Sequence, residues 1–155
     1  MKRLSWKYIA GLIDGEGCID VQVTNGLYVR PRVRIGMTKS SLFVLEILKE
    51  NHGGYLSYRE TSNEQWEDSV CWELVGYSQV CSFLRNIVNH LLIKQEQAKL
   101  ILWLEKEIKG KQVADEARQL IRTELKAMKR DPHRLSEKAQ EKIILACDAI
   151  VETTI

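Results

Sequence analysis

The sequence predicts an α+β fold in which helices cover one face of a single antiparallel sheet. Apolar residues recur with a helical period in some segments and alternate with polar residues in others. These segments follow one another in the order helix, strand, strand, helix, strand, strand, helix, and a helical tail follows. Strands that are joined by short connections pair antiparallel, and such a sheet can leave one face in contact with water. The order therefore predicts a sheet with an apolar face under helices and a polar face that is open.

The composition is that of a soluble globular protein with a substantial core. The chain has 155 residues, of which 45% are hydrophobic and 28% are charged. We expect one domain over residues 1–155, with a core at about 5–105 and a helical extension at about 112–152. The N-terminal residues do not resemble a signal peptide, and no apolar run is long enough to span a membrane.

The cysteines and histidines do not form a metal-binding pattern. The cysteines are far apart, include no CxxC pair, and do not cluster with the histidines. They are Cys18, Cys71, Cys81 and Cys147. We therefore expect thiols in a reducing compartment inside the cell, and no zinc site.

The first segments predict a helix and a hairpin. Ser5 is a suitable N-cap for a helix that runs to about Glu16. In residues 18–24 apolar and polar side chains alternate, which predicts a half-buried strand. Asn25-Gly26 is a strong two-residue hairpin signal, and the returning strand is expected at 27–37.

The returning strand concentrates positive charge. The net charge of the chain is only +2, so bulk charge does not indicate a nucleic-acid partner. Between residues 26 and 39, however, there is no acid, and the basic residues are Arg30, Arg32, Arg34 and Lys39. The strand also contains Pro31, which cannot donate a ladder hydrogen bond, and this predicts a strand that lies at an edge or is locally irregular.

The rest of the chain repeats the helix and hairpin pattern and then becomes helical. The expected elements are a helix from Leu42 to about residue 50, strands at 55–61 and 69–74, a helix at 78–92, and further helices at 94–108, 113–129 and from Ser136 onward. We expect the last helices to brace the domain, and we assign them no chemistry.

Residues 9–17 make a poor isolated surface helix. Gly11 and Gly15 would each cost about 1 kcal/mol relative to alanine in a helix interior. At about 100° per residue, small residues share one face of this helix and large apolar residues share the other. The small face consists of Ala10, Gly11, Asp14 and Gly15, and the large face consists of Ile9, Leu12 and Ile13.

The two faces predict different partners. The large face can pack on the chain's own core, and the small face lets a second helix approach closely. If that helix belongs to an identical chain, two Glu16 carboxylates converge at helix ends where the dipole is already negative. Carboxylates in such a place favour a hard divalent cation such as Mg²⁺. The alternative is an ordinary amphipathic helix that ends in a glycine C-cap, with Gly17 in the left-handed conformation.

The segment Ile9-Ala10-Gly11-Leu12-Ile13-Asp14-Gly15-Glu16-Gly17 resembles the signature of the LAGLIDADG homing endonucleases. Glu16 takes the place of the second acid, and Gly15 takes the place of the alanine before it. The resemblance covers about residues 5–105 and implies the αββαββα homing-endonuclease fold, whose antiparallel sheet forms a DNA-binding saddle. Because the motif occurs once, the resemblance implies a homodimer with Ala10, Gly11 and Asp14 at the interface.

The resemblance also implies a catalytic site. Residues 92–98 resemble the family's segment that carries a catalytic-pocket lysine, here Lys94. Lys39 lies where the family often has a polar or basic pocket residue. Glu16 and the Gly15 carbonyl would hold Mg²⁺, or Mn²⁺ or Ca²⁺ in the same site. From the residues alone, Lys94 could also be an ordinary lysine at a helix start.

The polar face of the sheet is predicted to bind DNA. A two-stranded ribbon fits the major groove, where arginine can grip guanine and glutamine can grip adenine. The candidate DNA-binding residues are Asp20, Gln22, Thr24, Tyr28, Arg30, Arg32, Arg34, Tyr55, Ser57 and Arg59. The alternative is a solvated face whose charges discourage edge-to-edge aggregation. The resemblance favours DNA, because the family reads its target with this sheet.

The function implied by the resemblance is site-specific hydrolysis of both strands of a long, near-palindromic DNA duplex. It would make one cut per strand across the minor groove and leave 3′ overhangs. Two other functions remain open, a maturase that binds its host intron's RNA and a catalytically inactive DNA-binding protein of the same fold. No membrane partner and no small-molecule cofactor are expected.

Overall fold

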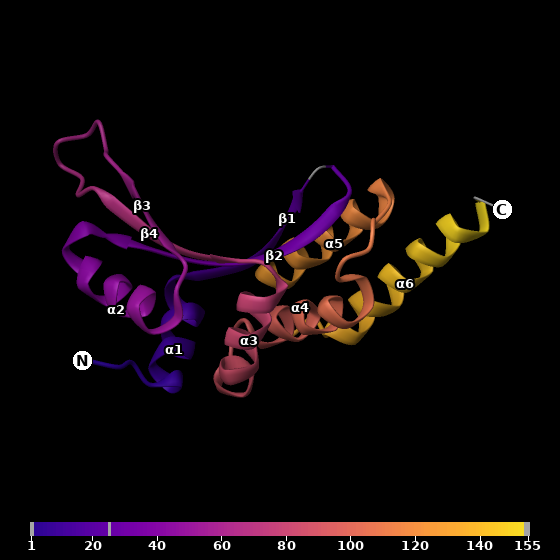
Figure 1. Cartoon of the computed structure of the whole chain (residues 1–155), viewed down its shortest axis with the longest axis horizontal. Coiled ribbons are helices and arrows are strands. Elements are labelled where there is room, and N and C mark those ends of the chain that lie inside the picture. The colour runs from indigo at the N-terminus through magenta and orange to yellow at the C-terminus, as the bar shows by residue number, and fades with distance from the viewer. Residues whose placement is uncertain (1, 25, 154–155) are drawn as a thin grey trace.

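The computed structural model describes residues 2–24 and 26–153, with side chains up to residue 147. The element order is the predicted one, αββαββα followed by further helices (Figure 1). The first part consists of α1 (Trp6–Glu16), β1 (Gly17–Thr24), β2 (Tyr28–Thr38), a 3₁₀ turn (Lys39–Ser41), α2 (Leu42–His52), β3 (Tyr55–Arg59) and β4 (Ser69–Val75). The second part consists of α3 (Tyr77–Ile87), a 3₁₀ turn (Val88–His90), α4 (Gln95–Ile108), α5 (Asp115–Arg130) and α6 (Ser136–Thr153).

The strands form one antiparallel sheet in the order β1-β2-β4-β3. Seen from the side, the two ends of the sheet curve away from the helices (Figure 1). The convex face of the sheet lies toward α1, α2, α3 and α4. The concave face points away from these helices. The predicted α+β architecture, with an antiparallel sheet shaped as a saddle, is therefore confirmed.

The alternation predicted for the strands is confirmed by burial. On the side that faces the helices, Ile19, Val33 and Trp72 are buried in one continuous core. The Trp72 ring packs beside Phe83 of α3, and its Nε1–H donates to the Gly53 carbonyl oxygen at 2.9 Å. The largest side chain of the core therefore has its polar atom paired, as a buried indole requires.

β2, the strand that contains Pro31, is not at an edge, so the first of the two predicted alternatives is wrong, and the second, a local irregularity, remains. β2 lies between β1 and β4, and Pro31 pairs with Val21 of β1. Pairing of β2 with β4 begins one residue later, at Arg32 opposite Val75. Pro31 therefore lies just beyond the end of β4, and its carbonyl accepts a hydrogen bond from the Gly76 N–H at 2.9 Å. The strand is central, but the position is locally an edge, and this is why proline is tolerated there.

The first turn of the sheet and the tail of the chain are joined. Asn25 of the predicted hairpin signal lies outside the described residues, and Gly26 beside it has φ of +70°. The Val113 N–H, in the connection before α5, donates to the Leu27 carbonyl oxygen at 2.8 Å. The turn between β1 and β2 is thereby tied to the connection between α4 and α5.

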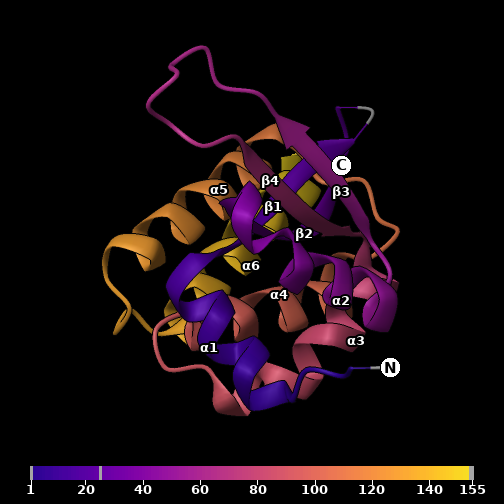
Figure 2. The ribbon, with the colours of Figure 1, turned by 90° about the vertical axis from the view of Figure 1, so that its left-hand side faces the viewer.

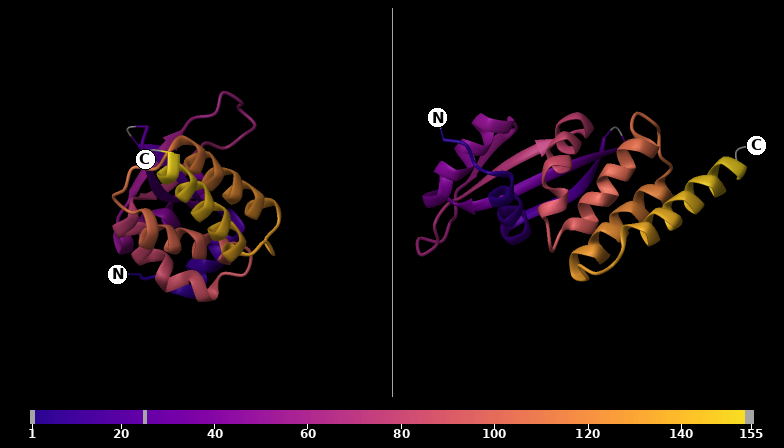
Figure 3. Two further views of the ribbon diagram at one scale, coloured as in Figure 1. Left: turned by 90° about the vertical axis from the view of Figure 1, so that its right-hand side faces the viewer. Right: turned by 90° about the horizontal axis from the view of Figure 1, so that it is seen from below.

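The C-terminal helices extend the core on one side of the sheet. α5 contacts β1, and α6 packs against α4 and α5 (Figure 3). The apolar residues of α5, such as Ile121 and Leu125, are buried in the same core as the sheet residues. None of the described helices is both long and apolar enough to cross a lipid bilayer.

Replacing Gly54 by alanine should destabilise the protein more than replacing Gly110. The Gly54 backbone has φ of +84°, and an added Cβ would lie 2.5 Å from the Glu73 carbonyl oxygen of β4. Gly110 has φ of +75° but no atom within 4 Å of the added Cβ. A strained left-handed backbone costs roughly 1–2 kcal/mol at either position, and the clash adds to this at Gly54. Urea unfolding of Gly54→Ala and Gly110→Ala measures the difference, and equal losses would contradict the close approach to β4.

Candidate active site and nucleic-acid interface

One face of α1 lies at the surface of the molecule and carries two glycines (Figure 2). It is formed by Tyr8, Gly11, Leu12 and Gly15, which recur with a helical period. A Cβ added at Gly11 or Gly15 would meet no atom within 4 Å. The fold of one chain therefore gives no reason for glycine at these two positions.

Ala10 does not belong to this surface face, and that part of the prediction is wrong. Its side chain is 0% exposed and lies in the core with Ile9 and Ile13. α1 is oriented so that Leu12, rather than the predicted Ala10, lies beside the two glycines at the surface. The sheet and the neighbouring helices set this orientation, because they need Ile9 and Ile13 inside.

Asp14 holds the beginning of α4. Its carboxylate accepts hydrogen bonds from the N–H groups of Leu92, Ile93 and Lys94 at 2.8, 3.1 and 3.0 Å. Lys94 is the N-cap of α4 and the other two residues precede it, so these N–H groups have no partner within the helix. Asp14, predicted to lie at an interface between copies, therefore has a role inside the chain, which is to join α1 to α4.

Lys94 is fixed beside the last turn of α1. Its Nζ donates to the Asp14 carbonyl oxygen at 2.7 Å, and only 9% of the residue is exposed. Burial lowers the pKa of the Lys94 ammonium, the negative charges of Asp14 and Glu16 oppose this shift, and the positive charge of Lys129 adds to it. The charges of Lys94 and Glu16 therefore interact, and the place of both residues in one catalytic site stays a prediction.

Glu16 is the last residue of α1 and is exposed. Among the described residues, its carboxylate makes no hydrogen bond or ion pair. It also lies at the negative end of the helix dipole, which disfavours a carboxylate. A bound cation would offset this.

Gly17 is not in the left-handed conformation, so the alternative that predicted a left-handed glycine C-cap at the end of α1 is wrong. Its φ is −91°, and the chain continues directly into β1. A Cβ at Gly17 would lie 2.8 Å from the Cα and carbonyl oxygen of Ile13. Glycine is needed here because the strand leaves the helix in close contact with its last turn.

The oxygen atoms at the end of α1 suit a hard divalent cation. Glu16 contributes a carboxylate and Gly15 a backbone carbonyl, and both residues are exposed. The described residues contain no group of three or more His, Cys, Asp or Glu side chains that could hold a metal ion. In the part of the chain that the structure describes, the end of α1 thus offers one carboxylate and one carbonyl oxygen to a cation.

Lys39 lies at the far end of β2, in the 3₁₀ turn that leads into α2. Its N–H donates to the Asp68 carbonyl oxygen at 2.8 Å, and its side chain is exposed. Within the part of the chain that the structure describes, it makes no hydrogen bond or ion pair with Glu16 or Lys94. Its predicted catalytic role stays a prediction.

The pairing register places all candidate DNA-binding residues on the concave face of the sheet. Gln22 lies opposite Arg30, and Thr24 lies opposite Tyr28. Asp20 lies opposite Arg32, and Arg34 lies opposite Glu73. Tyr55, Ser57 and Arg59 follow on β3, which is the edge strand on the other side.

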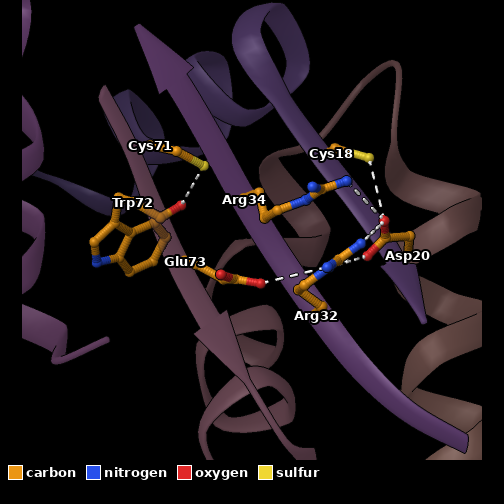
Figure 4. A network of polar contacts seen from close by, with 7 residues as sticks. All are labelled: Cys18, Asp20, Arg32, Arg34, Cys71, Trp72 and Glu73. Carbon is orange, nitrogen blue, oxygen red and sulfur yellow. Dashed lines mark hydrogen bonds and ion pairs between the residues drawn. The ribbon is translucent and has the colours of Figure 1, made fainter. Parts of the chain in front are cut away.

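The centre of this face is a network of charges that pair with each other (Figure 4). The Arg32 Nε and NH2 groups donate to the two Asp20 carboxylate oxygens at 2.9 and 2.8 Å. Arg32 also reaches Glu73 at 3.5 Å, and Arg34 donates to Asp20 at 3.1 Å. The hydrogen bond with Asp20 raises the pKa of the Arg32 guanidinium, although burial lowers it.

This network changes the interpretation of Arg30, Arg32 and Arg34. The fork of Arg32 that could grip guanine is already occupied by Asp20, and no sequence pattern indicates this pairing. Period-two spacing shows which residues share a face, but cross-strand partners depend on the register. Arg30 differs, because it is exposed and has no ion-pair partner among the residues that the structure describes.

Solved structures of homing endonucleases share this fold. A family model described as LAGLIDADG endonuclease matches residues 9–107. The homing endonuclease I-CvuI, in complex with its target in the presence of Ca, superimposes with a TM-score of 0.63 at 21% identity, covering 88% of this chain and 90% of that chain. I-SmaMI, a LAGLIDADG homing endonuclease bound to cleaved DNA, has a TM-score of 0.59 at 22% identity and covers 93% of this chain but 49% of that chain. At such identities the likeness shows the fold alone, and no curated protein sequence matches the chain.

Removing the Asp14 carboxylate should loosen the joint between α1 and α4. Asp14→Ala leaves three N–H groups without their acceptor, and we expect a loss of roughly 1–3 kcal/mol in the free energy of unfolding. The matched control is Ser5→Ala, which removes the single capping bond to the Tyr8 N–H at the other end of α1 and should cost about 1 kcal/mol or less. Urea denaturation measures both variants. A loss in Asp14→Ala no larger than in the control would contradict the role of Asp14 as the joint.

Proposed function

Because this chain belongs to the LAGLIDADG endonuclease family, we propose that it is a homodimeric homing endonuclease. It cleaves both strands of a long, near-palindromic DNA duplex by divalent-metal-dependent phosphodiester hydrolysis. The observation that carries the proposal is an uncovered glycine face on α1 that ends in an unpaired carboxylate, Glu16. An inactive DNA-binding protein would need neither the carboxylate nor the buried lysine beside it.

The glycine face explains why two copies are needed. Gly11 and Gly15 lie one helical turn apart and leave space for a second backbone. When two α1 helices meet along this face, the Glu16 carboxylates of both copies come to the shared end. The two partial metal sites then become neighbours, and each can serve one strand of the duplex.

The active site combines a metal-binding end with a fixed cation. Glu16 and the Gly15 carbonyl would hold Mg²⁺, or Mn²⁺ or Ca²⁺ in the same place, and the bound ion would activate water and neutralise charge on the phosphate oxygens. Lys94, held by the Asp14 carbonyl, stabilises the negative charge that develops at the phosphate. Lys39 is a second candidate for this role, if DNA binding brings its exposed side chain to the site.

The concave sheet face is the proposed DNA-binding surface. A ribbon such as β1 and β2 fits the major groove, where Gln22 and Arg30 are free to reach base edges. Arg32 and Arg34 meet DNA in a preset arrangement, because Asp20 fixes their guanidinium groups. Each saddle would cover a half-site of about one helical turn, which makes the whole target long and nearly symmetric.

Incubation with randomised duplex DNA and Mg²⁺, followed by sequencing of the cut ends, tests this proposal. Cleavage of both strands at one near-palindromic sequence is the expected result. Binding to one sequence without cleavage would identify an inactive DNA-binding protein instead. A preference for structured RNA over duplex DNA, measured in parallel, would identify a maturase.

Glu16→Gln should abolish cleavage and leave DNA binding intact. The substitution keeps the shape of the side chain and removes the charge that would hold the metal. Cleavage of the selected target and its equilibrium binding in Ca²⁺ are the two measurements. The exposed Glu46→Gln on α2 is the matched control and should keep both activities. Metal-dependent cutting by Glu16→Gln at an unchanged rate would reject the ligand role.

Gly11→Leu should separate the two copies without unfolding either. A side chain at this position has open space within one chain, so the fold of the monomer should survive. The same side chain would push a partner helix away, because close helix contact needs small residues. Light scattering gives the oligomeric state and circular dichroism gives the fold. A folded variant that stays dimeric would place the interface elsewhere.

A further inference from the structure

A hollow of about 350 Å³ lies between β1 and α5, beside the concave face of the sheet. On the strand side it is lined by Cys18, Asp20 and Arg34, and on the helix side by Arg122, Lys126 and Lys129. We call the last three residues the α5 basic ridge. None of them belongs to the family motif or to the sheet.

The α5 basic ridge occupies one narrow face of its helix. Residues spaced by four and three positions lie above one another, so Arg122, Lys126 and Lys129 form a single row. All three are exposed, while the neighbouring Ile121 and Leu125 are buried and anchor the helix to the core. The row therefore projects from a firmly held helix.

Several basic residues near the ridge pair with acids, whereas the ridge charges do not pair with any acid among the described residues. Arg118 pairs with Asp115, and Arg134 and Lys142 pair with the buried Glu124. Among the described residues, none of the three ridge side chains forms an ion pair. At about 100° per residue, Glu124 lies on the opposite side of the helix from the ridge.

The single acid that lines the hollow is already in use. Asp20 accepts the hydrogen bonds of both Arg32 and Arg34. The unpaired positive charge of the hollow therefore lies on its helix wall, and no free carboxylate is found among its lining residues, all of which the structure describes. An anion from outside the chain can pair with this charge.

From this arrangement we infer that the α5 basic ridge binds the phosphate backbone of the DNA that lies on the saddle, and this rests on the proposed function. The row from residue 122 to residue 129 extends about 10.5 Å along the helix. Successive phosphates of one strand are about 3.4 Å apart along the duplex axis, so a row that runs along this axis spans about three phosphate steps. The ridge flanks the edge strand β1 and so meets the backbone, while the sheet meets the groove.

The ridge also joins the catalytic end of the molecule. Lys129 lines the hollow together with Cys18, which is two residues beyond Glu16, and with Gln97, which is three residues beyond Lys94. The Lys129 end of the ridge therefore lies beside the site that contains Glu16 and Lys94. The phosphates held by the ridge would be those next to the cut, so the ridge positions the strand for cleavage.

The test measures how DNA binding depends on salt in a variant whose ridge side chains are uncharged. The triple variant Arg122→Gln, Lys126→Gln and Lys129→Gln is compared with Lys49→Gln, Lys106→Gln and Lys138→Gln, which removes the same charge from exposed positions on α2, α4 and α6. Binding to the selected target and to a random duplex is measured in Ca²⁺ between about 50 and about 300 mM salt, a range over which counterion release changes the affinity strongly. Circular dichroism confirms that both variants are folded.

The ridge variant should bind both duplexes more weakly, by a similar factor, because phosphate contacts carry no sequence information. The slope of log affinity against log salt should become shallower by about 0.9 for each phosphate that the ridge no longer neutralises. The control variant should keep the slope of the unaltered protein. A ridge variant with the slope and affinity of the control would overturn the inference, as would a weakening confined to particular base pairs. The comparison of the ridge variant with the control tests the inference alone. If the unaltered protein itself binds no duplex DNA, the proposed function fails, so the two failures are distinguishable.

Discussion

The joint between α1 and α4 is the interaction on which the rest of the site depends. The Asp14 carboxylate receives the first N–H groups that lead into α4, and the Lys94 ammonium returns to the Asp14 carbonyl oxygen. One residue of the motif helix therefore fixes both the helix end that carries Glu16 and the lysine beside it. Burial of Lys94 is tolerated because its ammonium is hydrogen-bonded at 2.7 Å, whereas an unpaired buried charge would be costly.

The joint also divides the motif helix into two sides with different roles. Ile9, Ala10 and Ile13 are in the core, and Asp14 is committed to α4. What remains is a strip with Gly11 and Gly15 that no described part of the chain covers. Under the proposed function, a second copy would cover this strip and bring its own Glu16 carboxylate to the metal-binding end.

Much of this could be predicted from the sequence, because periodicity decides which side of an element is buried. Alternation in β1, β2 and β4 identified the concave face correctly, and Ser5 caps α1 as expected. The errors arose at residues whose burial or pairing depends on tertiary contacts. Ala10 is small enough for either side of a helix, and it lies in the core. Pro31 indicated an edge strand or a local irregularity; the strand is central, but its residues 28–31 have no partner on the β4 side.

Charge pairing was the part of the candidate site that could not be predicted. Arg32 is held between Asp20 and Glu73, which are 12 and 41 residues away along the chain. The helical period of α5 predicted only a helix that braces the domain. The position of its basic ridge next to β1 depends on tertiary packing, which the period does not show. The spacing of Arg122, Lys126 and Lys129 was visible, but the hollow that they line was not.

Disulfide trapping between copies tests most directly whether the glycine strip of α1 meets its own symmetry mate. A cysteine at Gly11 would lie close to the same cysteine of a second copy, within the roughly 4.4–6.8 Å between Cα atoms that a disulfide requires. Mild oxidation of Gly11→Cys should then give a covalent dimer, while Ser82→Cys, exposed on α3, should give no more dimer than the unaltered protein. If Gly11→Cys crosslinks no faster than Ser82→Cys, the paired-helix account is contradicted.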